Sequence, residues 1–233
     1  MKKILLSIVA LVSIWNYNAQ TWENVGTPGF SAGVVSSTSL AFSNTGEPYV
    51  AYRDNLNFNE ATVMKHDGTN WVNVGTAGFS SGYAWFTSLA FSNTGEPYVA
   101  FQDGTNSDKA TVMKFNGTNW QTVGSAGFSV GAASDISLGF NSSGQPNVAF
   151  IDGGNSDKAS VMKFDGINWV NVGTAGFSSG TASGVSLAFS NTGEPYVAFK
   201  DGSNSFKATV MKFNGTSWVN VGNAGFSAGS ANS

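Results

Sequence analysis

Apolar and polar residues alternate along short stretches of this chain, and residues typical of tight turns separate each stretch from the next. Within one representative segment, the pattern predicts four strands, over 185–189, 195–199, 208–213 and 218–221. Residues 191–194 and 201–205 read as connecting turns, and Asn214-Gly215 predicts a two-residue hairpin. Helical periodicity is absent beyond the N-terminal apolar run. The segment is therefore predicted to be a four-stranded antiparallel meander.

The predicted strands are apolar on both faces. In the strand 195–199, Tyr196 and Ala198 point to one side while Val197 and Phe199 point to the other. A sheet with two apolar faces must be covered on both sides. The sequence thus predicts that each sheet is sandwiched between neighbours.

The same segment recurs along the chain at a fixed period. Its period of 49 residues is marked by tryptophans at Trp22, Trp71, Trp120, Trp169 and Trp218. Four complete copies begin near Ser37, Phe86, Asp135 and Gly184. A unit of this length with four short strands is typical of a blade. We therefore predict an all-β fold of tandem four-stranded antiparallel blades of a β-propeller.

The number of repeats leaves the closure of the ring open. A spare fourth-strand segment, 22–26, precedes the four copies, and 223–233 follows them. The ring could be incomplete, the spare strand could cap an edge or complete a blade in another molecule, or the chain could be a piece of a longer array. An unpaired edge strand would also offer a site for self-association.

The segment from Pro195 to Val221 combines a strand, an Asp-Gly loop, a second strand, a Phe-Asn-Gly-Thr turn and a tryptophan. In this it resembles a Kelch-type propeller blade, although the regular Gly-Gly pair is missing. The pattern is also similar to tandem propeller lectins with near-identical blades and to the sialidase Asp-box hairpin. These resemblances imply a propeller fold and indicate function only weakly.

The N-terminus predicts export. Residues 1–19 join a basic start to a short apolar run, as a signal peptide does, with cleavage expected between Ala19 and Gln20. The remainder, 20–233, is then the repeat domain of a secreted protein, located outside the cell, in the periplasm or on the cell surface. The apolar run is too short to span a membrane. A net charge of −3 argues against nucleic acid as a partner.

Positions that differ between near-identical copies are candidates for function. Just before the first strand, the second copy alone carries three aromatic residues, Tyr83, Trp85 and Phe86. On an exposed rim they would form an apolar contact for a glycan or a protein partner. The alternative is that they fill a local gap or drifted after duplication.

The loops after the second strand contain oxygen ligands of the kind that Ca²⁺ prefers. The candidate ligands are Asp103, Asn106, Asp108, Asp152, Asn155 and Asp157. The competing interpretation is ordinary turn chemistry, for which Asp, Asn, Gly and Ser are the usual residues. No other cofactor is expected.

Catalytic patterns are sparse in the sequence. The single histidine, His66, stands where other copies carry phenylalanine, and Glu47, Glu96 and Glu194 recur in turns that a ring would hold apart. We therefore predict a secreted, non-catalytic module that binds glycans or a surface partner through repeated shallow sites. The alternatives are a structural or surface-array protein and a propeller-type glycan hydrolase or lyase.

Overall fold

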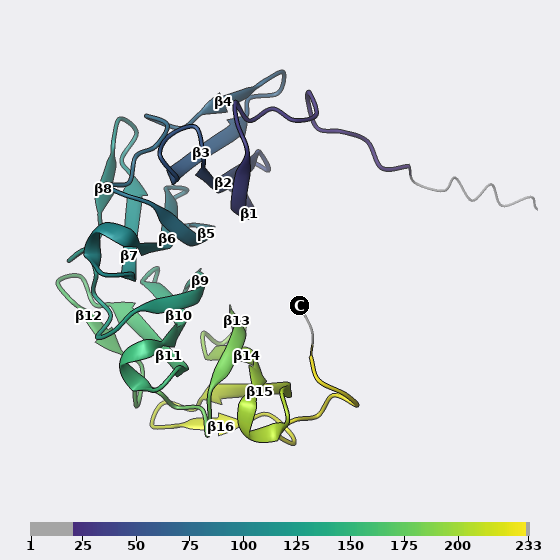
Figure 1. Cartoon of the computed structure of the whole chain (residues 1–233), viewed down its shortest axis with the longest axis vertical. Helices are drawn as coiled ribbons and strands as arrows, with labels where there is room; N and C mark the ends of the chain where they lie inside the picture. The colour runs from purple at the N-terminus through teal and green to yellow at the C-terminus, as the bar shows by residue number, and fades with distance from the viewer. Residues whose placement is uncertain (1–20, 232–233) are drawn as a thin grey trace, which may run out of the picture.

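The computed structural model describes residues 21–231, and these form four antiparallel four-stranded sheets in chain order (Figure 1). The predicted signal peptide lies outside the described residues. The first two sheets are β1 (Val35–Phe42), β2 (Pro48–Asp54), β3 (Glu60–His66), β4 (Trp71–Asn73), and β5 (Ala84–Phe91), β6 (Pro97–Asp103), β7 (Lys109–Phe115), β8 (Trp120–Thr122). The last two are β9 (Ala133–Phe140), β10 (Pro146–Asp152), β11 (Lys158–Phe164), β12 (Trp169–Asn171), and β13 (Ala182–Phe189), β14 (Pro195–Asp201), β15 (Lys207–Phe213), β16 (Trp218–Asn220).

These sheets, here called blades 1 to 4, confirm the predicted all-β architecture of tandem blades. Within each blade the strands pair in sequence order, so each blade is a meander. The helical content of the described chain is limited to three short 3₁₀ turns, η1 (Gly104–Asn106), η2 (Gly153–Asn155) and η3 (Gly202–Asn204). Within residues 21–231 no helix has the length and apolar character needed to cross a membrane.

The first strand of each blade begins earlier than the sequence pattern predicted, because it contains a β-bulge. In blade 4 the pairing of β13 with β14 shifts between Ser183 and Ser186, and Gly184 has a φ of 60°. The equivalent residues in the earlier blades also have positive φ, although none is glycine: Ser37, Phe86 and Asp135. A bulge re-aims the side chains next to it.

The Asn-Gly hairpin is present, but its geometry differs from the two-residue turn expected. Four residues separate β15 from β16, and the Asn214 N–H donates to the Ser217 carbonyl at 3.1 Å. Gly215 alone has positive φ in this turn, at 97°. Asn214 contributes through its side chain, whose Oδ1 accepts from the N–H groups of Thr216 and Ser217. The asparagine is therefore an Asx-type cap of the turn.

The apolar core lies between blades, which confirms the predicted two-faced strands. Tyr98 and Ala100 of β6 pack in the cluster shared with blade 3. Val99 and Phe101, the alternate residues of the same strand, pack in the cluster shared with blade 1. A third cluster joins blades 3 and 4. Each junction therefore buries one face from each of two blades.

The repeated tryptophan fastens each blade to the one before it. Trp120 Nε1 donates to the Val74 carbonyl of blade 1 at 2.8 Å. Its ring stacks on Phe79, with centroids 4.2 Å apart. Trp169 and Trp218 make the same hydrogen bond to the residue 46 positions earlier. One residue type thus supplies both a large buried ring and a satisfied polar group.

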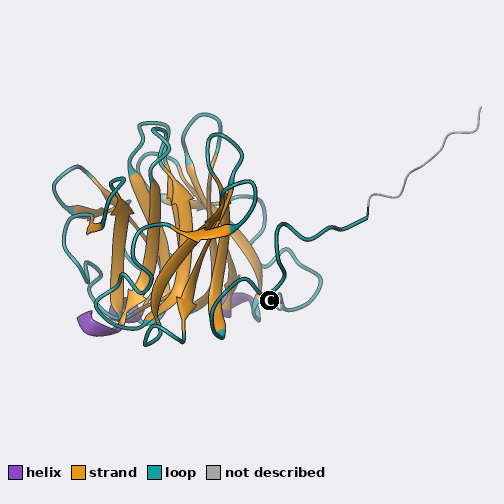
Figure 2. Cartoon of the chain, turned by 90° about the horizontal axis from the view of Figure 1, so that it is seen from above, coloured by secondary structure: helices purple, strands orange, loops and turns teal. Residues whose placement is uncertain are grey.

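Together the blades form an open arc, with blade 1 at one end and blade 4 at the other (Figure 1), and Figure 2 shows the strands from the side, with loops above and below them. The spare segment 22–26 is not a strand. Instead, the Val25 carbonyl accepts from Trp71 Nε1 at 2.8 Å, and Phe30 stacks on Trp71 at 4.1 Å. This segment therefore caps blade 1 in the way that the preceding blade caps each later one.

Replacing Trp120 by alanine should lower the free energy of unfolding by about 3 to 5 kcal/mol, as expected for a truncated core aromatic. Trp120 is 9% exposed, whereas Trp22, at the same position of the repeat, is fully exposed. Trp22→Ala is therefore the matched control, and it should leave stability unchanged. Urea unfolding followed by circular dichroism measures both, and equal midpoints for Trp120→Ala and the wild type would contradict the assignment.

Candidate functional site: clefts between neighbouring blades

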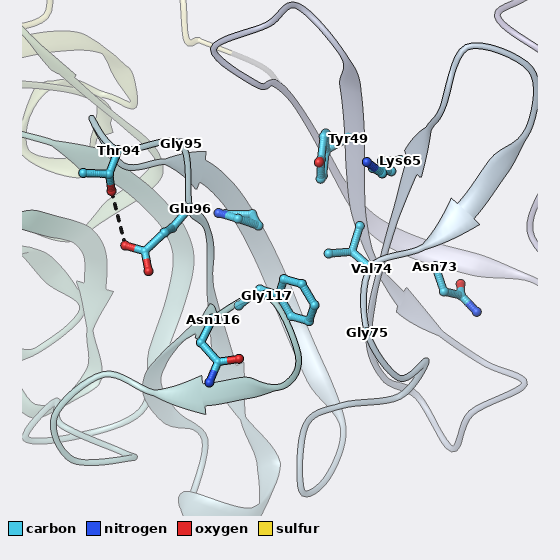
Figure 3. Close-up of a pocket in the computed structure, with 12 residues that line it drawn as sticks. Tyr49, Lys65, Asn73, Val74, Gly75, Thr94, Gly95, Glu96, Asn116 and Gly117 are labelled. Atoms are coloured by element: carbon cyan, nitrogen blue, oxygen red, sulfur yellow. Dashed lines mark hydrogen bonds between the residues drawn. The ribbon is translucent and has the colours of Figure 1, made fainter.

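A cleft of about 450 Å³ opens between blades 1 and 2 (Figure 3). Blade 1 contributes residues from β2 and β3 and from the stretch after β4, while blade 2 contributes the turn before β6 and the end of β7. The lining residues are Tyr49, Lys65, Asn73, Val74, Gly75, Thr94, Gly95, Glu96, Pro97, Phe115, Asn116 and Gly117. Its size is in the range of small-ligand sites.

Tyr49 and Lys65 form the blade 1 wall, and the pairing of β2 with β3 places them side by side. The ammonium group of Lys65 lies 5.8 Å from the centre of the Tyr49 ring. It also lies 3.7 Å from the carboxylate of Glu47. Tyr49 is held by an edge-on contact with Phe91 of blade 2, with centroids 4.9 Å apart. The aromatic ring is therefore fixed, while the charged pair is half exposed.

The opposite wall is the turn that carries Thr94 and Glu96. Thr94 Oγ1 donates to a Glu96 carboxylate oxygen at 3.3 Å, as Figure 3 shows. The other oxygen of Glu96 lies 3.5 Å from Lys114 Nζ. Asn116, in the hairpin after β7, adds an amide to this side. The cleft thus presents an ammonium, carboxylate oxygens and an amide around an aromatic ring.

The arrangement of the blade 1 wall is repeated in blade 2 but not in blade 3. In blade 2, Lys114 lies 5.9 Å from the Tyr98 ring, and Tyr98 contacts Phe140 of blade 3 edge-on. In blade 3 the tyrosine is replaced by Asn147 and the glutamate by Gln145, although Lys163 remains. Blades 1 and 2 therefore carry the complete tyrosine, lysine and glutamate set, and blade 3 carries a natural variant of it.

Blade 4 carries the same set on its outward face, where no blade follows in the described chain. Lys212 Nζ lies 3.0 Å from Glu194 and 5.9 Å from the Tyr196 ring. The hydrogen bond from Lys212 lowers the pKa of Glu194, and the same bond raises the pKa of Lys212. Both groups therefore keep their charge at neutral pH. Exposed pairs of this kind add little stability, so their recurrence calls for another explanation.

The three predicted aromatic residues lie near the start of β5, separately from the cleft. Trp85 is 37% exposed, and the guanidinium of Arg53 sits 3.6 Å from the centre of one of its rings. Tyr83 donates its hydroxyl to Asp108 at 3.2 Å, and this bond raises the pKa of Tyr83. Phe86, also 37% exposed, occupies the bulge. We call Trp85, Phe86 and Arg53 the aromatic rim.

Arg53 and the Lys–Glu pairs were missed by the sequence interpretation. Arg53 occupies a position filled by Gln102, Ile151 and Lys200 in the other copies. Arg53 and Trp85 each differ from the residues at the same position in the other copies, and they stand in adjacent copies. This was the signal in the sequence that could have identified the pair. Likewise, a lysine follows each of the glutamates Glu47, Glu96 and Glu194 at the same spacing of 18 residues.

The loops of the calcium prediction use their leading aspartates to close the turn. Asp152 accepts from the Gly154 N–H through Oδ1, and from Asn155 Nδ2 and Ser160 Oγ through Oδ2. Asp103 accepts equivalent bonds from Thr105, Asn106 and Thr111. Across residues 21–231, no three His, Cys, Asp or Glu side chains are grouped as metal ligands. The geometry supports the turn interpretation, and calcium binding stays a prediction.

His66 packs beside the tryptophan of its own blade. Its ring contacts Trp71 with centroids 5.6 Å apart, and Nδ1 accepts from the Gly68 N–H at 3.3 Å. Nε2 is buried against Gly26, whose added Cβ would lie 3.0 Å away. The His66 ring therefore fills space next to the segment that caps blade 1.

Comparison with solved structures places the fold among β-propellers. An exo-beta-1,3-galactanase from Clostridium thermocellum is 16% identical, with a TM-score of 0.51 over 81% of this chain and 49% of its own. An endo-1,4-beta-xylanase from Bacteroides thetaiotaomicron is 13% identical, with a TM-score of 0.53 over 81% of this chain and 72% of its own. This chain thus spans about half the length of the galactanase.

A lectin from Aleuria aurantia, solved with Fucalpha1-6GlcNAc, is 20% identical, with a TM-score of 0.55 over 82% of this chain and 64% of its own. No protein-family model matches the sequence, and the search of curated proteins found no match. At these identities the likeness shows the fold alone. The chain is therefore a β-propeller-type array of blades, and the resemblance to Kelch blades is not supported.

The prediction that the protein is not an enzyme is contradicted by the same comparisons. Glycoside hydrolases predominate among the similar structures, including a thermostable family-43 enzyme and an exo-beta-1,3-galactanase from Bifidobacterium bifidum. The argument from the sequence was that equivalent carboxylates around a ring stay apart. That argument fails as an exclusion because a propeller can bring unlike residues of different blades to one place.

Asp152→Asn should lower the free energy of unfolding by about 1 to 3 kcal/mol, because an amide keeps only one of the two oxygens that accept from the three donors and turns an NH₂ group toward the remaining donor or donors. Asp157→Asn changes an exposed residue of the same loop and is the control. Thermal melts of both variants measure the difference. Added CaCl₂ that raises the melting temperature of the wild type, but not of Asp157→Asn, would support calcium binding instead.

Proposed function

We propose that this protein recognises carbohydrate chains through the clefts between its blades. The observation that carries this proposal is the recurring set of an aromatic ring, an ammonium and a carboxylate, Tyr49, Lys65 and Glu47 in blade 1, of which Tyr49 and Lys65 line a half-open cleft of about 450 Å³. Tyr98, Lys114 and Glu96 repeat this set in blade 2.

The chemistry of the cleft suits a sugar. Each sugar hydroxyl can both donate and accept a hydrogen bond, and the cleft offers a donor in Lys65 together with an acceptor in Glu96. The apolar face of a sugar ring can lie against the partly exposed ring of Phe115, beside Tyr49, which is 9% exposed. The structures of similar fold include a galactanase, a xylanase and a lectin in complex with Fucalpha1-6GlcNAc, which supports the proposal.

Repetition of the tyrosine, lysine and glutamate set in blades 1 and 2 favours extended or branched ligands. The cleft between blades 1 and 2 is open, so we expect it to bind weakly by itself. When two equivalent sets engage one chain, the second contact is intramolecular, and avidity can add a factor of roughly 10² to 10⁴. A glycan polymer should therefore bind much more tightly than its monosaccharide.

Lys65→Met and Lys114→Met together should weaken binding of the best glycan on an array of fucosylated, galactan and xylan oligosaccharides by about tenfold or more, because each charged hydrogen bond contributes about 1.5 to 3 kcal/mol. Lys163→Met makes the same change in blade 3, which lacks the tyrosine and the glutamate. That control should bind like the wild type. Equal affinities for all three proteins, or no binding to any oligosaccharide, would reject the clefts as the site.

The aromatic rim is the place we propose for a further contact with the same ligand. Arg53 over Trp85 combines two residue types that often dominate binding energy, and it exposes a flat apolar ring next to Phe86. Trp85→Ala should then reduce affinity for the longest oligosaccharides and leave that for monosaccharides unchanged. Titration calorimetry with a series of chain lengths measures this, and a uniform effect at every length would argue against the rim.

Incubation of the bound oligosaccharides with the protein, followed by chromatography of the products, determines whether recognition is accompanied by cleavage. Released sugars would place this chain with the hydrolases of similar fold in activity. Unchanged oligosaccharides, with binding intact, would place it with the lectin.

A further inference from the structure

The two ends of the arc leave complementary halves of one interface uncovered. The leading face of a blade is formed by the residues that point toward the next blade, and the trailing face by those that point toward the preceding blade. Each internal junction packs the leading face of one blade on the trailing face of the next. Among residues 21–231, no blade covers the trailing face of blade 1 or the leading face of blade 4 (Figure 1). The described chain therefore displays one unused copy of each half.

The trailing face of blade 1 is apolar and exposed. Leu40 is 60% exposed, although its equivalent in blade 2, Leu89, is 6% exposed beneath blade 1. Phe42 is also exposed, whereas its equivalent Phe91 is partly buried in a junction. A hollow of about 480 Å³ beside these residues is lined by Phe30, Val35, Thr38, Leu40, Val50 and Tyr52, among others.

The leading face of blade 4 is also exposed where the equivalent residues of the other blades are buried. Val221 is 40% exposed, against 7% for its equivalent Val74 in blade 1. Ala198 is exposed, whereas Ala51, Ala100 and Ala149 at the same position are completely buried. A second hollow, of about 440 Å³, lies over Ala198 and Ala208.

Hydrogen bonds between blades follow the same register. Ser39 Oγ accepts from the Leu89 N–H at 2.9 Å, and Ser88 and Ser137 accept from the leucine 50 residues later in the same way. The next serine of the series is the exposed Ser186 on blade 4. The leucine that begins the series is Leu40 on blade 1. The open ends therefore match in shape, apolar surface and hydrogen-bonding groups.

We propose that a second copy of this chain docks head to tail, with the trailing face of its blade 1 on the leading face of blade 4. This association uses blade faces, not the unpaired strand edge that the sequence suggested. Because the two surfaces differ, the interface is heterologous, and repeated docking gives either a closed ring or an open filament.

Docking requires that the segment that caps blade 1 be displaced from Trp71. Trp71 of the incoming copy is stacked by its own Phe30, and its Nε1 is bonded to Val25. Phe226 and Val221 of the receiving copy stand at the equivalent positions of the repeat, and Phe226 is exposed. The two segments therefore compete for one tryptophan, so the cap restrains assembly.

Light scattering after size-exclusion chromatography tests this proposal at protein concentrations up to about 100 µM, which detects dissociation constants in the micromolar range. Wild-type protein should form concentration-dependent oligomers. Leu40→Asp and Ala198→Arg each place a charge on one face and should each give monomers. Ile167→Asp changes an exposed residue in a hairpin turn of blade 3 and should assemble like the wild type.

Mixing the two monomeric variants separates this geometry from other forms of association. Leu40→Asp retains the leading face and Ala198→Arg retains the trailing face, so an equal mixture should form a one-to-one dimer and nothing larger. Phe30→Ala should strengthen assembly of the wild type several-fold because the cap is weakened. A wild type that stays monomeric, a single variant that assembles normally, or a mixture without dimers would each overturn the proposal, provided that circular dichroism shows all variants folded.

Discussion

The burial of one blade against the next is the interaction on which this structure depends. Each sheet is apolar on both faces, so a single blade would leave one or both faces in water. The three internal junctions cover these faces with fully buried side chains such as Phe101, Val112 and Phe150. The hydrophobic effect scales with the apolar area removed from water, so stability here is a property of neighbours and not of isolated units.

The need to bury both faces of each blade also distinguishes the residues of the scaffold from those of the candidate site. Residues that fill the junctions recur in every copy, because each junction needs the same shapes. Residues at the mouths of the clefts are free to vary, and the third junction has lost the tyrosine and glutamate that the first two share. The aromatic rim is a further departure, since it pairs the unusual Arg53 of one copy with the unusual Trp85 of the next. Function is therefore expected where the repeat is broken or exposed.

The solved structures of similar fold include both a lectin and glycoside hydrolases. A ring of blades presents loops from several sheets around one axis, and unlike residues can meet there even when the repeats are nearly identical. This is why an argument from the spacing of equivalent glutamates does not exclude catalysis. In this chain the cleft between blades 1 and 2 brings an ammonium, a carboxylate and an amide together beside an aromatic ring.

The sequence by itself determined the class of fold, the strand order in each blade and the faces of the central strands. Period-two alternation, Asn-Gly turns and a repeat of constant length are local or periodic signals, and local physics is enough to interpret them. It also marked the tryptophan as a residue that every copy keeps. It did not reveal that the N-terminal segment would cap Trp71 without forming a strand, or that the arc would remain open.

Only the tertiary structure decided which residues meet across blades. The contact of Arg53 with Trp85 and the cleft beside Tyr49 join residues from different copies. A sequence pattern gives the direction of a side chain within its strand, but not the twist and separation of two sheets that pack together. Those depend on how all the side chains of both faces fit at once, so the site emerges only when the blades are assembled.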